Sequence, residues 1–195
     1  MLLEGVRVGF AITGSFCTFA KTIPQIEVLV KEGAEVFPII SESVDKFDTR
    51  FGTAEDLKKD LIGITGKNPV STIVDAEPIG PKGLLDIMVI APCTGNTIAK
   101  IANAITDGPV TMACKAHLRN MRPVVIAVST NDGLSANAKN LGILLNMKNI
   151  YMVPFGQDDP IKKCTSLVAD FDKILFSVQS ALQNIQIQPM LISRT

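Results

Sequence analysis

One stretch near the middle of the sequence restricts the possible folds more than any other. Ile87–Ala91 is a short and almost continuous apolar run, which is typical of a strand buried on both faces of a parallel sheet. Pro92 has no N–H group, so we expect it to end the strand. A small polar turn, Cys93–Gly95, follows, and Asn96 or Thr97 can cap the next helix. This order of strand, turn and helix predicts an anion or cofactor site, because free backbone N–H groups and the positive end of the helix dipole point to the same place. An ordinary strand-to-helix turn has the same pattern and is the alternative.

Apolar strands alternate with helical segments along the whole chain. The expected strands cover residues 6–12, 35–40, 70–74, 87–91, 123–128 and 150–153. The expected helices cover residues 16–32, 53–66, 96–105, 109–121, 134–145 and 161–183. Such alternation predicts an α/β fold: a doubly wound, Rossmann-like or flavodoxin-like sheet that is mostly parallel and carries helices on both faces.

The remaining segments are expected to be irregular. Residues 41–52 are polar, and residues 77–83 are broken by proline and glycine. Residues 186–195 form a polar, proline-broken tail that either frays or docks on a neighbouring chain. Because no shift in composition divides the sequence, we expect a single domain over residues 1–195, with a core of residues 1–185 followed by the tail.

Three small polar loops follow expected strands, namely Thr13–Ser15, Cys93–Thr97 and Ser129–Gly133. Their Gly, Ser, Thr and Asn residues let a backbone approach a ligand closely and donate hydrogen bonds to it. Because the carboxyl ends of parallel strands share one edge of a sheet, we expect the three loops to form one pocket. The candidate cofactor-binding residues are Thr13, Gly14, Ser15, Pro92, Cys93, Thr94, Gly95, Asn96, Thr97, Ser129 and Thr130.

Composition argues against several classes of partner. The chain of 195 residues has a formal net charge of zero and no basic block, which argues against nucleic acid. No apolar run approaches the roughly 20 residues that span a bilayer, so no membrane partner is expected. The four cysteines form no C-x-x-C pair, which favours reduced thiols in the cytoplasm and no metal site. Since tryptophan is absent and Tyr151 is the only tyrosine, a planar ligand is expected to lie against backbone and aliphatic groups.

The central motif resembles that of a known family. Pro92–Thr97 resembles the Pro-Ala-Ser-Ala-Asn-Thr motif of the flavin-containing cysteine decarboxylases and shares its proline, asparagine and last threonine. Ala11–Ser15 resembles the first phosphate loop of that family, and Met121–Leu145 resembles a segment of the flavin prenyltransferases in the same superfamily. The resemblance implies a flavoprotein-like fold, FMN as a possible cofactor, and a homo-oligomer with sites near subunit interfaces.

A narrower resemblance covers the opening segment Gly5–Ser41 and the loop Gly156–Pro160, which are similar to the B subunits of dipicolinate synthases from spore-forming bacteria. It implies an oxidoreductase subunit that acts in the mother-cell cytoplasm during sporulation. The implied reaction converts a dihydrodipicolinate-type dicarboxylate of the lysine pathway to pyridine-2,6-dicarboxylate. The resemblance also implies a separate A-like partner subunit that binds NAD(P), and we expect the chain to be inactive without it.

Two departures weigh against other flavin chemistry. Where the decarboxylases carry a catalytic histidine, this chain reads Asp75–Ile79, and its only histidine is His117. Glu77 is a candidate replacement, although an exposed loop carboxylate is the simpler interpretation. The prenyltransferases use an arginine where this chain has Thr130, which cannot make bidentate cationic contacts. An FMN-binding decarboxylase-like enzyme and a non-catalytic nucleotide-binding or scaffold subunit are the alternative functions.

Asn96 is the candidate catalytic residue, because its amide can donate and accept hydrogen bonds at once and so orient a flavin edge or a substrate carboxylate. A role as a helix cap is the alternative. Cys17 and Cys93 lie in or beside the loops, where a helix N-terminus can activate a thiol, but most such cysteines are buried packing residues. His117 is expected to be a packed or interface residue. Lys21 either meets an anion near the first loop or is solvated.

Overall fold

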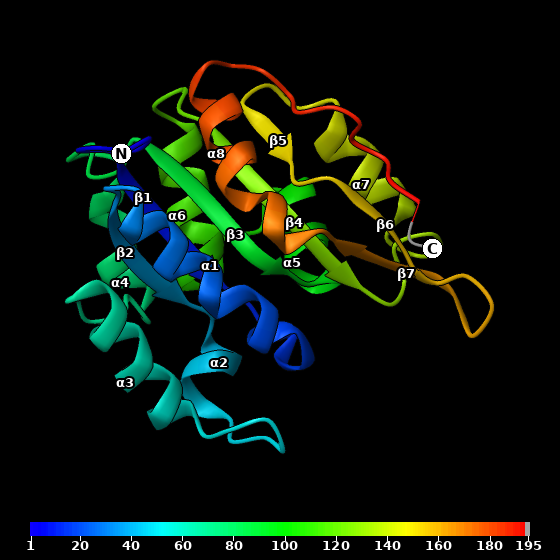
Figure 1. Cartoon of the computed structure of the whole chain (residues 1–195), viewed down its shortest axis with the longest axis horizontal. Coiled ribbons are helices and arrows are strands. Elements are labelled where there is room, and N and C mark those ends of the chain that lie inside the picture. Colours follow the sequence, from blue (N-terminus) through cyan, green and yellow to red (C-terminus); the bar gives the residue numbers. More distant parts are fainter. Residues whose placement is uncertain (194–195) are drawn as a thin grey trace.

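The computed structural model describes residues 1–193 and shows a seven-stranded sheet between two layers of helices (Figure 1). The strands are β1 (Arg7–Ile12), β2 (Glu35–Ile40), β3 (Ile87–Cys93), β4 (Val124–Thr130), β5 (Ile150–Met152), β6 (Phe155–Asp159) and β7 (Lys163–Ala169). Their order is β2-β1-β3-β4-β7-β6, and β5 also pairs with β4. The pairings among β1 to β5 are parallel, whereas β7 is antiparallel to both β4 and β6. The predicted α/β fold with a mostly parallel sheet is confirmed.

Helices cover both faces of this sheet. The α-helices are α1 (Phe19–Lys31), α2 (Glu42–Lys46), α3 (Ala54–Thr65), α4 (Ile73–Ala76), α5 (Gly95–Ala102), α6 (Pro109–Leu118), α7 (Ala138–Leu145) and α8 (Ile174–Leu182). Single 3-10 turns are η1 (Phe16–Thr18), η2 (Glu77–Ile79) and η3 (Phe171–Lys173). The helices α1 and α8 pack together on one face, and α5, α6 and α7 lie on the other (Figure 1).

The side chains of β3 and β4 explain why these two strands lie at the centre of the sheet. Every residue of β3 is buried, and six of the seven residues of β4 are buried as well. Both strands are rich in Val, Ile and Ala, which fit a pleated surface that helices cover on both sides. The core of the domain therefore lies on both faces of β3 and β4, and their carboxyl ends are held rigidly where the sheet opens to solvent.

Local signals set several helix ends as predicted. The side chain of Thr53 accepts a hydrogen bond from the Asp56 amide at 3.1 Å and caps α3. The helix ends at Gly66, whose φ of 68° is left-handed. Pro109 opens α6 as expected. Pro24 lies inside α1, which is continuous through it.

The largest correction concerns the segment after residue 153. The predicted helix 161–183 is wrong over its first part, because β7 occupies Lys163–Ala169 and only α8 is helical further on. Residues 150–153 are therefore not the last strand. The apolar residues at the end of β7 are buried between β4 and β6, so pairing with these two distant strands outweighs the helical spacing of the sequence.

Two further segments differ from the prediction. The expected strand 70–74 reduces to an isolated bridge between Ile39 and Val70, because the side chain of Thr72 caps α4 directly afterwards. The segment 41–52 is not wholly irregular, since α2 begins after Ser41 with acidic residues in its first turn.

The two strands that lead to the candidate site are longer than predicted. Pro92 does not end β3, which continues to Cys93 with a shift of register against β4 between Ile90 and Cys93. Ser129 and Thr130 are the last residues of β4 and not loop residues, because β7 provides an antiparallel partner for them.

The C-terminal tail packs on the chain itself. The Gln186 side chain bonds the backbone N–H and C=O of Met152, and Leu191 forms a parallel bridge with Phe155 at the sheet edge. The described part of the tail therefore neither frays nor needs a neighbouring chain, while residues 194–195 lie outside the described residues. The division into one domain with a core of residues 1–185 stays a prediction. Within residues 1–193, no helix is long and apolar enough to cross a membrane.

Candidate cofactor and substrate pocket

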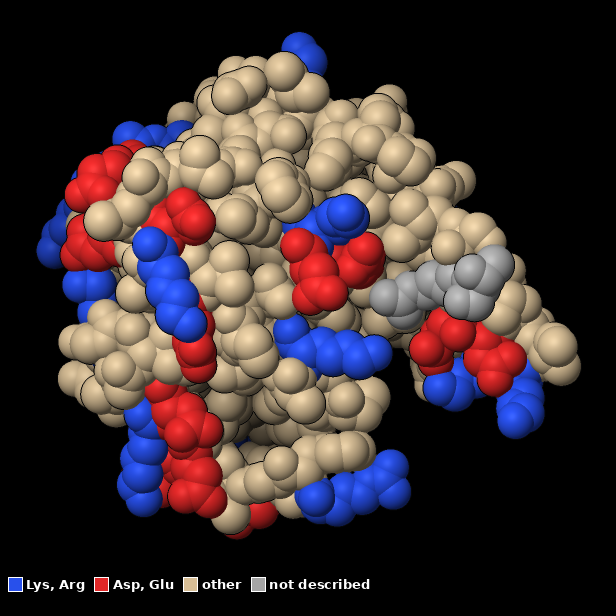
Figure 2. All heavy atoms as spheres, in the orientation of Figure 1, with Lys and Arg blue, Asp and Glu red and all other residues tan. Residues whose placement is uncertain are grey.

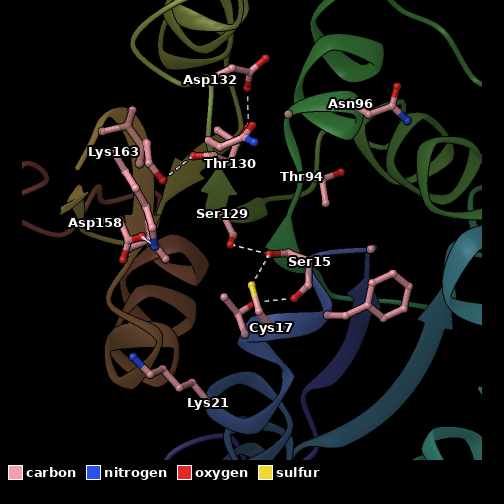
Figure 3. A pocket seen from close by; sticks show the side chains of 18 of the residues that line it. Ser15, Cys17, Lys21, Thr94, Asn96, Ser129, Thr130, Asp132, Asp158 and Lys163 are labelled. Carbon is pink, nitrogen blue, oxygen red and sulfur yellow. Dashed lines mark hydrogen bonds and ion pairs between the residues drawn. The ribbon is translucent and has the colours of Figure 1, made fainter. Parts of the chain in front are cut away.

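A pocket of about 810 Å³ lies at the carboxyl ends of β1, β3 and β4 (Figure 3). The chain runs from β1 to β2 on one side of β1 and then continues with β3 on its other side. The strand order therefore reverses between β1 and β3, where the pocket lies. The loops Thr13–Ser15, Cys93–Thr97 and Ser129–Gly133 all contribute to its wall, and the predicted convergence is confirmed. The part of the wall that they form is here called the inner wall; its residues are Gly14, Ser15, Thr94, Gly95, Asn96, Ser129, Thr130, Asn131 and Asp132.

The first loop contributes a cluster of donors to the inner wall. The hydroxyls of Ser15 and Ser129 are 2.8 Å apart and join the ends of β1 and β4 (Figure 3). The amides of Gly14, Phe16 and Cys17 have no acceptor within residues 1–193, and all three residues line the pocket. This loop can therefore donate several hydrogen bonds to an anion without losing any of its own.

The helix after β3 is capped by Thr94, and not by Asn96 or Thr97 as expected. The Thr94 hydroxyl accepts a hydrogen bond from the Thr97 amide at 3.4 Å. Asn96 lies in the first turn of α5, and its exposed side chain has no partner within the described part of the chain (Figure 3). Its amide is thus free to donate to and accept from a ligand, and the alternative role as a cap is wrong.

Gly95 lies against the end of β4 so closely that no other residue fits. A Cβ atom on Gly95 would lie 2.5 Å from the Thr130 hydroxyl and 2.7 Å from both the Asn137 amide nitrogen and an Asp132 oxygen. The absent side chain allows the start of α5 to pack on these polar groups. The inner wall is therefore continuous from β3 to β4.

Behind Gly95 runs a chain of polar side chains that the sequence did not reveal. Asp132 accepts hydrogen bonds from Thr130 at 2.5 Å and from Asn137 at 2.7 Å. Asn137 accepts one from Asn140, which in turn accepts one from Asn103 in the turn after α5. Asn137 and Asn140 are both buried. The chain fixes α5 and α7 to the end of β4, because each amide has its donor and acceptor sides assigned.

Four candidate residues do not face the main pocket. Thr13 is buried, donates to the Pro92 carbonyl at 2.7 Å and accepts from the Thr94 amide at 3.0 Å. Pro92 and Cys93 are buried within β3, and burial raises the pKa of the Cys93 thiol, so no thiolate forms there at neutral pH. Thr97 lines a second pocket of about 360 Å³, which Asn96 shares. The structure thus gives Thr13 a role in positioning the loops.

Several pocket residues were missed or left open by the sequence. Arg50 lies in the connection between α2 and α3, with its guanidinium 4.9 Å from the centre of the Phe51 ring. Lys163 at the start of β7 pairs with Asp158 at 2.6 Å, and this hydrogen bond raises the pKa of the lysine, so it stays cationic. Lys21 also lines the pocket. Three phenylalanines, Phe16, Phe51 and Phe171, line it as well, so the pocket also offers aromatic surface; the groups against which a planar ligand lies stay a prediction.

No imidazole lies at this pocket. His117 is buried in α6, its Nε2 is 3.0 Å from the Pro123 carbonyl, and burial lowers the pKa of the ring to about 4. The expectation that His117 is a packed residue is confirmed. Glu77 is exposed in η2 and does not line the pocket. Within residues 1–193, no cluster of three His, Cys, Asp or Glu residues could hold a metal ion.

Known proteins share this fold and sequence. The Flavoprotein family model matches residues 2–183. The B subunit of dipicolinate synthase from Bacillus subtilis (strain 168) is 51% identical over 190 residues, which cover 97% of this chain and 95% of that protein. The crystal structure of the dipicolinate synthase B subunit from Bacillus halodurans C is 47% identical, with a TM-score of 0.92 and 100% of both chains covered.

A more distant structure shares the fold alone. The FMN-dependent cysteine decarboxylase SpaF is 22% identical, with a TM-score of 0.65 over 93% of this chain and 98% of that chain. The chain therefore belongs to the Flavoprotein family and, within it, to the group of dipicolinate synthase B subunits.

Proposed function

We propose that this chain is the B subunit of a dipicolinate synthase. Together with an A-like partner subunit that binds NAD(P), it converts a dihydrodipicolinate-type intermediate to pyridine-2,6-dicarboxylate. The observation that carries this proposal is the 51% identity to the Bacillus subtilis protein over 97% of the chain, since a likeness of that extent includes the segments around the pocket. The oxidoreductase role, the partner and the dicarboxylate substrate all follow from it.

The donor set of the inner wall fits a flavin mononucleotide. The free amides of Gly14, Phe16 and Cys17 and the hydroxyl of Ser15 are suited to a phosphate, which needs several donors at once. Asn96, with no partner of its own, is suited to a ring edge that presents both donors and acceptors. A bound flavin would supply a two-electron acceptor.

The chemistry divides between the two subunits. Aromatising a dihydropyridine ring removes one hydride and one proton, so an electron acceptor and a base are needed. In this proposal the hydride goes to the nicotinamide of the partner subunit, and the proton is released to solvent. The residues of this chain bind and orient the substrate, and the Asn96 amide makes one hydrogen bond at the site that strengthens as the reaction proceeds.

The pocket also suggests how the protein assembles. The pocket is partly open to solvent, so covering a planar ligand fully requires another chain, and we propose a homo-oligomer with sites near subunit interfaces. By relation to the Bacillus protein, the compartment is the mother-cell cytoplasm of a spore-forming bacterium. Sedimentation should show an oligomer at micromolar concentration. A clean monomer would contradict this part of the proposal.

Reconstitution tests the proposed reaction. The purified chain, the purified partner, and their mixture are each supplied with freshly formed dihydrodipicolinate and NAD(P), and dipicolinate is followed by its ultraviolet absorbance. We expect product only in the mixture, at a rate that depends on NAD(P). Full synthesis by this chain without partner or nucleotide would refute the division of labour.

Flavin binding has a separate test. Protein purified from its native source should show flavin absorbance in the visible range, and the ligand released by denaturation should have the mass of FMN. Colourless protein that takes up no added FMN would contradict the cofactor assignment and leave the scaffold alternative in its place.

A further inference from the structure

Three cationic side chains line the pocket in addition to the inner wall. Lys21 comes from the first turns of α1, Arg50 from the connection between α2 and α3, and Lys163 from the start of β7. In the space-filling view, basic side chains are spread over the visible face and do not form one large patch (Figure 2). These three residues are here called the cationic rim.

The cationic rim carries charge that the chain itself does not neutralise. Lys21 and Arg50 form no ion pair within residues 1–193, and only Lys163 has a carboxylate partner, Asp158. Away from the pocket, Lys58, Lys67 and Lys100 are each paired with a carboxylate within 3 Å; the partners are Asp45, Glu35 and Asp107. Lys21 and Arg50 thus line the pocket without a carboxylate partner among the described residues, so an anionic ligand in the pocket can pair with them.

Two of the three cations are also held at the mouth by contacts. The Arg50 guanidinium lies over the Phe51 ring, and the ion pair with Asp158 holds the Lys163 ammonium (Figure 3). Such contacts lower the entropy that a long side chain loses when it binds a ligand. A solvated surface lysine or arginine has no comparable restraint.

The inner wall and the cationic rim therefore offer different chemistry. The inner wall presents mainly neutral amides and hydroxyls, which suit directional hydrogen bonds to a phosphate or a ring edge, and its one carboxylate, Asp132, accepts hydrogen bonds from Thr130 and Asn137. The cationic rim presents full charges, which bind carboxylates through charge-assisted hydrogen bonds, bidentate in the case of arginine. Because the volume of about 810 Å³ is large for a small-molecule site, both regions can be occupied at once.

On the basis of the proposed function, we propose that the cationic rim binds the two carboxylates of the substrate and selects doubly charged small acids over singly charged ones. The guanidinium of Arg50 binds one carboxylate through two hydrogen bonds, and the ammonium groups of Lys163 and Lys21 attract the second carboxylate. The flavin site and the acid site then lie in one pocket.

Binding measurements with two related acids test this inference without any turnover. Pyridine-2,6-dicarboxylate and pyridine-2-carboxylate are titrated calorimetrically into the wild type, Arg50→Gln and Lys163→Gln. The matched controls are Arg119→Gln and Lys162→Gln, which remove the same charges at exposed positions outside the pocket lining. Melting curves establish that every variant is folded.

We expect the wild type to prefer the dicarboxylate, and to lose much of that preference as salt is raised. Each rim variant should bind the dicarboxylate about tenfold more weakly and the monocarboxylate at most about threefold more weakly, while the controls match the wild type. An undiminished preference in both rim variants, or equal losses in the controls, would overturn the inference. If the subunit mixture makes dipicolinate while the rim variants bind normally, this inference alone fails. If the rim selects dicarboxylates but the mixture makes no product, the proposed function fails alone.

Discussion

The inner wall and the cationic rim both line the pocket, but the fold holds them in different ways. The inner wall stands at the ends of buried strands, and contacts between distant parts of the chain fix it. The Ser15 hydroxyl meets that of Ser129, and Thr13 joins the loop after β1 to Thr94 after β3. Gly95 is packed against the polar chain behind it.

The cationic rim stands on exposed segments, and neighbours close in sequence hold its charges. Lys163 pairs with Asp158 across one hairpin, and Arg50 lies over the adjacent Phe51. No residue of the rim belongs to the core. Substitutions at the packed residues of the inner wall should therefore change stability and binding together, whereas substitutions in the rim, or at the exposed Asn96, should leave stability unchanged.

The largest effect is expected from Gly95→Ala in the inner wall. The added methyl would meet three polar atoms at 2.5 to 2.7 Å, so α5 must move away from β4. Overpacking of this kind costs about 3 kcal/mol of the free energy of unfolding. Urea unfolding measures this loss, and the calorimetric titrations described above measure the accompanying loss of ligand binding.

Gly63→Ala is the matched control for that substitution. Gly63 lies inside α3 with nothing within 4 Å of an added Cβ, so the change should stabilise the protein by about 0.5–1 kcal/mol. If Gly95→Ala were as well tolerated as this control, the inner wall would not be the closely fixed surface described here.

Acid pH should weaken the protein through a residue outside both regions. Burial, followed by the nearby Arg122 charge, lowers the pKa of His117 to about 4, although the Pro123 carbonyl and Asp86 act in the other direction. The unfolded chain takes up this proton near pH 6.5, so unfolding becomes easier as the pH falls from about 6.5 to 4. The loss should reach about 3 kcal/mol at the lower end.

His117→Gln keeps a side-chain donor near the Pro123 carbonyl but cannot titrate. Its unfolding free energy should change much less between pH 6.5 and 4 than that of the wild type. Equal slopes for the two proteins would mean that acid acts through other groups instead, such as Asp86, whose pKa is lowered by its hydrogen bond with Arg7.

The inner wall could be predicted from the sequence, and the rim could not. The strands β1, β3 and β4 are evident in the sequence as apolar runs, because they are buried on both faces. Since the three strands are parallel, the small polar loops after them must lie at the same edge of the sheet. These are local signals. They placed Ser15, Thr94 and Ser129 together, although they missed that Thr94 is the cap.

The rim depends on contacts that no local pattern carries. Leu167 and Phe171 fit a helical stripe as well as they fit a strand followed by a turn, and only the antiparallel pairing of β7 with β4 and β6 decides between the two. Because residues 161–183 were expected to be a helix, the sequence could not predict that Lys163 lines the pocket. Arg50 was missed in the same way, within a segment that was expected to be irregular.

A smaller effect, on turnover alone, is expected from Asn96→Ala. The side chain is exposed and makes no hydrogen bond within the described residues, so its loss should leave the melting temperature unchanged. Turnover by the subunit mixture should fall by about tenfold, which corresponds to one positioned hydrogen bond of roughly 1.4 kcal/mol in the transition state. Asn146→Ala, at an exposed asparagine outside the pocket, is the control. Unchanged rates would remove Asn96 from the site.

The smallest effect is expected from Asp158→Asn in the rim. An exposed ion pair contributes little to stability, so the melting temperature should shift by less than about 2 °C. Binding should respond more, since the carboxylate of Asp158 competes with the ligand for Lys163 and repels a dianion at the pocket mouth. We expect pyridine-2,6-dicarboxylate to bind about two- to fivefold more tightly in low salt, with the gain fading as salt is raised. Weaker binding would mean that Asp158 serves mainly to position Lys163, and the rim would then resemble the inner wall in being held by its own contacts.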